Sequence, residues 1–251
     1  MGETIVFTSG KGGVGKTTTI ANIGAELSQL DKKVVMLDTD MGLRNLDVVM
    51  GLEDKINYNL LDLLMNRCRL NQALIRDKRF PNLFLIPASL KSVDLDKYKE
   101  QFAILIEHLK SEFDYCLIDC PAGIEQGYRF ATSVADRAIL LTTPHVTAIK
   151  DAGRVLHLLN GSQIQQVELI INDYDEKMVR KKYMLSKEDI SDLFDIPILG
   201  AIPHDNKVIV SQNKGLPVVA MRSKATRSFR NLSLRMVNNN IHQKEETYDF
   251  S

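Results

Sequence analysis

Cysteine and aromatic residues are scarce in this sequence of 251 residues, and tryptophan is absent. The three cysteines, Cys68, Cys116 and Cys120, are too few and too scattered for a disulfide framework, which indicates a reducing compartment. No apolar run reaches the roughly 18 residues that a membrane-spanning helix needs. The N-terminal sequence MGETIVFTSG has no basic segment before an apolar stretch, so it is not a secretory signal. We therefore expect a cytoplasmic protein.

An excess of charge of either sign is also lacking, because 32 Lys and Arg residues balance 32 Asp and Glu residues. A neutral chain has no overall field that draws it to polyanions, so we expect no specific nucleic-acid partner. Hydrophobic residues make up 44% of the sequence and charged residues 25%, which is typical of a globular protein and excludes wholesale disorder.

Short apolar segments alternate with longer helical patterns along the chain. Strands are predicted over residues 4–8, 33–37, 83–86, 115–118, 137–141, 167–171 and 198–202, and helices over 17–30, 96–112 and 147–160. Strands that are apolar throughout and separated by helices are typical of a parallel sheet covered on both faces. We therefore predict one α/β domain over residues 1–237, a doubly wound, mostly parallel sheet with helices on both faces.

The segment 222–237 allows two interpretations. Four apolar residues fall on one helical face, with basic residues nearby: Ala225, Phe229, Leu232 and Met236. The segment is either a basic amphipathic helix that lies on a membrane or a last helix that packs its apolar stripe against the sheet, which is favoured because such a stripe normally faces a core. The polar residues 238–251 are predicted to form a disordered tail.

The strongest motif is GKGGVGKTT, which fits the phosphate-loop pattern G-x-x-x-x-G-K-[ST] between a predicted strand and a predicted helix. Glycines let backbone N–H groups surround phosphate oxygens, and the helix N-terminus favours the same anion. Lys16 is placed to reach the β- and γ-phosphates, and the Thr17 hydroxyl to bind Mg²⁺ directly. The predicted nucleotide-binding residues are Gly10, Lys11, Gly12, Gly13, Val14, Gly15, Lys16, Thr17 and Thr18.

A second lysine in this loop, Lys11, is not required by the general motif. It is either an ordinary solvated side chain or a cation that reaches across a dimer interface to the γ-phosphate bound by the other subunit. In the second case it would act as arginine fingers do in other enzymes that transfer phosphoryl groups. Spacing alone does not choose between the two.

Carboxylates follow two of the predicted strands, at the edge where parallel sheets bind their ligands. Asp38 ends the VVMLD strand, Asp40 lies two residues further on, and Asp119 ends the YCLID strand. We expect Asp119 to hold Mg²⁺ through water, with Asp38 as a second carboxylate that also acts through water. Asp40 is placed to orient or deprotonate the attacking water. Lys11, Lys16 and Asp40 are therefore the candidate catalytic residues.

With these motifs the chain resembles the deviant Walker A ATPases of the MinD/ParA family, and among them the MinD branch. GKGGVGKTT carries the extra lysine of the family. DTDMGLRNLDVVMGLE, residues 38–53, resembles the switch I segment of MinD proteins, and DCPAGIEQG, residues 119–127, resembles their switch II segment. The likeness runs nearly to residue 237.

This resemblance implies an ATPase that is monomeric with ADP and forms a sandwich dimer with ATP and Mg²⁺. Lys11 would then reach into the nucleotide site of the partner, and Asp40 would position the water. The positions that match adenine contacts in the family are Asn172, Pro203 and Asp205, and those that match dimer and switch contacts are Asn45 and Gly123.

The resemblance also implies a role in placing the cell-division septum. The family partners are MinC, a division inhibitor, and MinE, which stimulates slow ATP hydrolysis and releases the protein from the inner face of the membrane. MinD proteins usually end in a short basic amphipathic helix, whereas QKEETYDFS is acidic and would be repelled by anionic lipid. Three possibilities follow: residues 222–237 replace that helix, another protein provides a tether, or the protein does not cycle on a membrane.

Other functions occur on the same fold, and each makes its own demand on the sequence. A ParA-like or flagellar-positioning ATPase is the alternative within the family. A small-molecule kinase or ligase needs a second substrate pocket, and no inserted subdomain is present to form one. The sequence therefore favours an ATP-driven positional switch.

Overall fold

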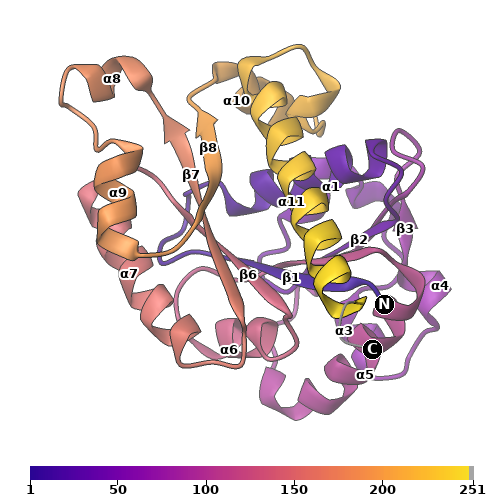
Figure 1. The fold of residues 1–251 in the computed structure, drawn as a ribbon. Helices are drawn as coiled ribbons and strands as arrows, with labels where there is room; N and C mark the ends of the chain where they lie inside the picture. The colour runs from indigo at the N-terminus through magenta and orange to yellow at the C-terminus, as the bar shows by residue number, and fades with distance from the viewer. Residues whose placement is uncertain (249–251) are drawn as a thin grey trace.

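The computed structural model describes the backbone of residues 1–248 and side chains through Asn238. Within these residues an eight-stranded sheet runs in the order β3-β4-β2-β5-β1-β6-β7-β8 (Figure 1). The strands are β1 (Glu3–Thr8), β2 (Val34–Asp38), β3 (Ile75–Arg76), β4 (Leu83–Ile86), β5 (Tyr115–Asp119), β6 (Arg137–Thr142), β7 (Gln166–Tyr174) and β8 (Ile198–Pro203). All neighbours are parallel except β3 and β4. The predicted fold class is confirmed.

Helices cover both faces of this sheet. One face carries α1 (Lys16–Gln29), α2 (Leu46–Met50), α10 (Asn206–Gln212), the 3-10 turn η3 (Val218–Ala220) and α11 (Lys224–Tyr248). The other face carries α3 (Leu60–Leu64), α5 (Lys99–Glu112), α6 (Gln126–Thr132), α7 (Val146–Asn160) and α9 (Lys187–Phe194). The shorter elements are η1 (Glu53–Lys55), α4 (Leu70–Ala73), η2 (Leu95–Tyr98) and α8 (Glu176–Arg180).

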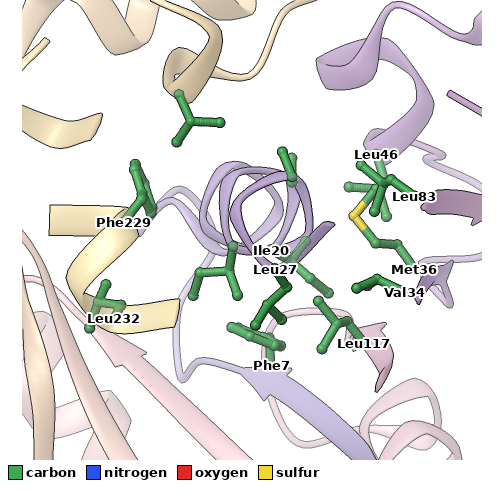
Figure 2. Packing of buried hydrophobic residues seen from close by; sticks show 14 of the residues in the cluster. Phe7, Ile20, Leu27, Val34, Met36, Leu46, Leu83, Leu117, Phe229 and Leu232 are labelled. Atoms are coloured by element: carbon green, nitrogen blue, oxygen red, sulfur yellow. The ribbon is translucent and has the colours of Figure 1, made fainter. Parts of the chain in front are cut away.

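The strands are apolar throughout because both of their faces are covered. In β1, Ile5 and Phe7 point to the layer that contains α1, whereas Val6 points to the opposite layer, and all three are fully buried. Figure 2 shows α1 nearly end-on within this core, between residues from the sheet and residues from α11. Helix α1 is therefore held on several sides, which fixes the phosphate loop that precedes it.

Helix α11 packs its apolar stripe into the core. Ala225, Phe229, Leu232 and Met236 are at most 2% exposed and belong to the cluster around α1. Phe229 lies between α11 and α1 (Figure 2), whereas Leu232 packs against Gly200 of β8. The basic residues of the segment are exposed. The core interpretation of residues 222–237 is confirmed, and this stripe is not free to lie on a membrane.

The C-terminal region differs from the predicted layout in one respect. The backbone of α11 stays helical to Tyr248, beyond residue 237. The last three residues, 249–251, and the side chains after Asn238 lie outside the described part of the chain. The division of the chain into a domain over 1–237 and a disordered tail over 238–251 therefore stays a prediction.

Two local features differ from the sequence-based expectation. Strand β3 has only two residues and pairs antiparallel with β4 at the edge of the sheet, so it is too short to produce a periodic pattern. The helix predicted over 96–112 is divided into η2 and α5 at Lys99. No helix in the part of the chain with described residues has the length and hydrophobicity to span a membrane.

Candidate functional site

The phosphate loop connects β1 to α1, and its glycines have different roles. Gly13 and Gly15 have φ of 80° and 90°, the left-handed region that suits glycine. Gly10 lies against α7, where an added Cβ would come within 2.2 Å of the Asp151 carbonyl oxygen. A Cβ on Gly12 or Gly13 would have no neighbour within 4 Å among the described residues. The space beside Gly12 and Gly13 is therefore open.

Lys16 and Asp119 meet beneath this loop. Lys16 begins α1, and its Nζ lies 3.7 Å from Oδ1 of Asp119 at the end of β5, with both side chains buried. Burial raises the pKa of Asp119, and the Lys16 ammonium and a hydrogen bond from Thr17 partly offset this rise. Oδ1 of Asp119 accepts no hydrogen bond from the described residues. A buried carboxylate oxygen with spare acceptor capacity is thus held next to the loop.

Asp38 lies directly beside Asp119, because β2 and β5 pair in parallel with these two residues in register. Its carboxylate accepts the backbone N–H of Asp40 at 2.9 Å and those of Asn45 and Leu46 at 3.1 Å each. Burial and the neighbouring Asp119 charge raise the pKa of Asp38 to about 7, although these three N–H groups act in the opposite direction. Asp38 therefore folds the segment 40–46 around the end of its own strand.

The other predicted residues of the two switch segments lie at the same edge. Asp40 is half-buried, and burial raises its pKa while the nearby Lys16 charge limits the rise. Asn45 is the residue before α2. Gly123 has φ of 94°, and its N–H donates to the Ser9 carbonyl at 3.1 Å, which ties the second switch segment to the phosphate loop. The Lys11 side chain is exposed.

Asn172 contacts the phosphate loop from β7. Its Nδ2 donates to the Val14 carbonyl at 2.8 Å, and it lies so close to Gly15 that a Cβ there would be 2.2 Å away. A cavity of about 190 Å³ opens beside this contact. It is lined by Gly13, Gly15, Thr18, Thr19, Asn172, Ile202, Val208, Gln212 and Phe229.

Pro203 and Asp205 lie near this cavity but do not line it. Pro203 ends β8 and borders a separate cavity of about 530 Å³. Asp205 precedes α10, and its carboxylate accepts backbone N–H groups of Lys207 at 2.9 Å and Lys224 at 2.8 Å. Burial by itself would raise the pKa of Asp205, but these N–H groups and that of Ala225 lower it overall. Asp205 joins the starts of α10 and α11, and its predicted contact with a base stays a prediction.

Two residues at the site were not among those predicted from the sequence, Gln212 and Thr39. Gln212 of α10 donates from Nε2 to the Thr18 hydroxyl at 2.5 Å, across 194 positions of the chain. Thr39 donates from its hydroxyl to the Asp119 carbonyl at 2.7 Å. The position of Thr39 between Asp38 and Asp40 was a signal for its role, whereas nothing near Gln212 in the sequence indicates its contact.

A phosphate loop after the first strand, a lysine at the start of the next helix and carboxylates at two adjacent strand ends define a P-loop ATPase. A family model described as an AAA domain matches residues 2–173. The chain is 48% identical to the septum site-determining protein MinD of Synechocystis sp., over 96% of this chain and 91% of that protein. The chain belongs to the MinD family.

Solved structures of relatives agree with this assignment. The MinC:MinD cell division protein complex of Aquifex aeolicus contains a chain that matches with a TM-score of 0.86 and 40% identity, over 94% of this chain and 96% of that one. MinD of Pyrococcus horikoshii, complexed with Mg-ADP, matches with a TM-score of 0.83 and 30% identity, over 93% and 95% of the two chains.

Proposed function

We propose that this protein is an ATP-dependent dimerising switch that positions the cell-division septum, with slow hydrolysis that a partner protein stimulates. The observation that carries the proposal is the meeting of Lys16, Asp38, Asp40 and Asp119 beneath the phosphate loop, with the segment after Asp40 folded onto Asp38. A change at the γ-phosphate can therefore alter the segment 40–46, which is what a nucleotide switch requires. The septum site-determining relatives support the cellular role.

The residues beneath the loop fit Mg²⁺ and a triphosphate. Hard oxygen ligands suit this cation, and the Asp119 oxygen with spare acceptor capacity is of that kind. Thr17 would bind the cation directly, and Asp119 and Asp38 would bind it through water. When bound, Mg²⁺ would withdraw negative charge from the phosphate oxygens. The Mg-ADP complex of the Pyrococcus horikoshii relative supports this assignment.

The chain supplies three groups for hydrolysis. Lys16 neutralises charge on the β- and γ-phosphates, and the exposed Lys11 does so from the partner subunit. Asp40 holds the attacking water and accepts its proton as the water oxygen bonds to the γ-phosphorus and the bond to the ADP oxygen breaks. Its raised pKa makes Asp40 a stronger base than an ordinary aspartate. Adenine would lie beside Asn172, with Pro203 and Asp205 on the adjoining loop.

Exposed apolar residues surround this site and support a dimer that closes over it. Leu43, Leu90, Ile124 and Val146 are 48–73% exposed, and each follows a strand of the parallel part of the sheet, namely β2, β4, β5 and β6. Parallel strands end at one edge, so the four side chains share the face of the molecule that carries Lys11. A second copy would cover them when ATP is bound, with Asn45 and Gly123 at the same face.

The partners follow from the relatives and from the family. The MinC:MinD complex of Aquifex aeolicus supports a MinC-like division inhibitor as the partner of the ATP-bound dimer. A MinE-like activator and a peripheral position at the inner face of the membrane complete the proposed cycle. Contact with a membrane would need a surface other than the stripe on α11, because that stripe is buried.

Light scattering of the purified protein with Mg²⁺ and either ATP or ADP tests this proposal, together with release of inorganic phosphate. We expect the molecular mass to double with ATP and not with ADP, and slow phosphate release. Lys16→Ala is the control, since loss of its ammonium should remove triphosphate binding and with it the doubling. An unchanged mass in ATP, or a mass that doubles equally in ADP, would refute the switch.

A further inference from the structure

Residues 89–96, here called the bridging segment, contact the first switch segment directly after Asp40. The Gly42 N–H donates to the Ser89 carbonyl at 2.8 Å, and the Ser89 N–H contacts Sδ of Met41 at 3.4 Å. The loop that carries Asp40 therefore rests on Ser89 through its own backbone. These contacts hold the bridging segment beside the backbone that follows Asp40.

The same segment holds the second switch segment through one side chain. Gln126 is the first residue of α6, and its Nε2 donates to Asp94 Oδ1 at 2.6 Å and Asp96 Oδ2 at 2.9 Å. Two carboxylates can only accept, so the amide must present its NH₂ group to them. Leu95, between the two aspartates, is 4% exposed and anchored in the core. The aspartates are thus presented from a fixed piece of backbone.

Helix α6 begins without a side-chain N-cap hydrogen bond, and the contact of Gln126 with Asp94 and Asp96 holds its first turn instead. The residue before the helix, Glu125, makes no side-chain hydrogen bond to the first turn. The loop ahead of it is tied at Gly123 to the carbonyl of Ser9 in the phosphate loop. Past the end of β5, where Asp119 and Cys120 are held by Thr39 and Phe7, the second switch segment is tied to the phosphate loop at Gly123 and to the bridging segment at Gln126.

We propose that Gln126 is a positioning residue for ATP hydrolysis, which through Asp94 and Asp96 sets the second switch segment against the loop that carries Asp40. This rests on the proposed function. Both segments must be placed to within a fraction of an ångström for water and γ-phosphate to align. Gln126 itself is not proposed to contact the water or the γ-phosphate. We therefore expect its substitution to change kcat and not nucleotide affinity.

Two substitutions that give this neutral side chain a positive or a negative charge test the proposal. Gln126→Lys keeps a donor between the two carboxylates and should stay within about twofold of the wild-type kcat. Gln126→Glu places a third carboxylate there and removes both hydrogen bonds, so kcat should fall several-fold, with about tenfold as the upper limit because the contact is exposed. Both variants should keep the wild-type affinity for ADP. Thermal unfolding of both checks that they are folded.

The decisive experiment exchanges the donor and acceptor roles of residue 126 and its two partners, Asp94 and Asp96. In Asp94→Asn/Asp96→Asn the partners gain NH₂ groups, so adding Gln126→Glu should restore the contact and most of the lost kcat. Equal kcat for wild type, Gln126→Lys and Gln126→Glu would overturn the role of Gln126, as would a Gln126→Glu defect that the double asparagine background does not relieve. Failure of the proposed function has a different signature, because the wild-type protein itself would then release no phosphate from ATP.

Discussion

Replacing Gly10 of the phosphate loop with alanine should destabilise the fold, whereas the same replacement at Gly12 should leave stability unchanged and weaken nucleotide binding. In Gly10→Ala the new methyl group would lie 2.2 Å from the Asp151 carbonyl oxygen, which belongs to the backbone of α7 and cannot rotate away. Overpacking of this kind costs about 1–3 kcal/mol. For a chain of this length, that corresponds to a fall in Tm of roughly 2–12 °C. In Gly12→Ala the methyl group meets no described atom within 4 Å, so the free energy of unfolding should change by less than about 0.5 kcal/mol.

The two variants also separate packing from ligand binding. The open side of the loop at Gly12 is where phosphate oxygens are proposed to lie, so a methyl group there should weaken ADP binding at least about tenfold, or 1.4 kcal/mol. Urea unfolding without nucleotide and calorimetric titration with Mg-ADP measure the two effects. A Gly10→Ala protein as stable as the wild type, or a Gly12→Ala protein that binds Mg-ADP normally, would refute this account of the loop.

Three further predictions follow from single contacts. Phe229→Ala should lower the free energy of unfolding in urea by about 3–5 kcal/mol, because Phe229 is 1% exposed in the core. Arg227→Gln, at an exposed position of the same helix, should leave it unchanged. Equal stability of the two variants would contradict a core role for the stripe. The Asp173 carboxylate, 2.6 Å from Nδ1, raises the pKa of His204 above 6.5, so the pair stabilises the fold fully below that pH, and the gain is lost as pH rises through the raised pKa. Since both side chains are about half exposed, His204→Gln should remove under about 1 kcal/mol at pH 5.5 and nothing at pH 9 in thermal unfolding; a loss independent of pH would exclude this ion pair. Asn172→Ala should weaken ADP binding about tenfold and reduce the preference for ADP over GDP in calorimetric titrations, and unchanged affinity would place the base elsewhere.

Much of the fold could be predicted because its strands are apolar on both faces and its longer helices are amphipathic. Ile5, Val6 and Phe7 are buried in two different layers, which produces an uninterrupted apolar run in the sequence. The edge strand β3 was not predicted, since two residues carry no periodicity. The stripe on α11 was ambiguous because a core and a membrane surface demand the same spacing, and only its burial decided between them.

The site residues that could be predicted are those that lie in short motifs or directly after a predicted strand. Lys16 follows from the loop motif, and Asp38 and Asp119 follow from their position at strand ends. Gln126 and Gln212 were missed because their partners lie about 30 and 194 positions away, and no local pattern records such contacts. For Asp205 the family resemblance predicted a contact with the nucleotide. It did not predict that the Asp205 carboxylate joins the starts of α10 and α11.

The central claim is that Lys11 acts in the active site of the other subunit, and mixing two inactive variants tests it most directly. Lys11→Ala and Asp40→Asn should each release little phosphate from ATP alone. In a mixed dimer, the site of the Lys11→Ala subunit retains Asp40 and receives Lys11 from its partner, so an equal mixture should recover about a quarter of the wild-type rate, given random pairing in a two-fold dimer. If Lys11 served its own subunit, both sites of the mixed dimer would be defective, and a mixture no more active than its components would contradict the account.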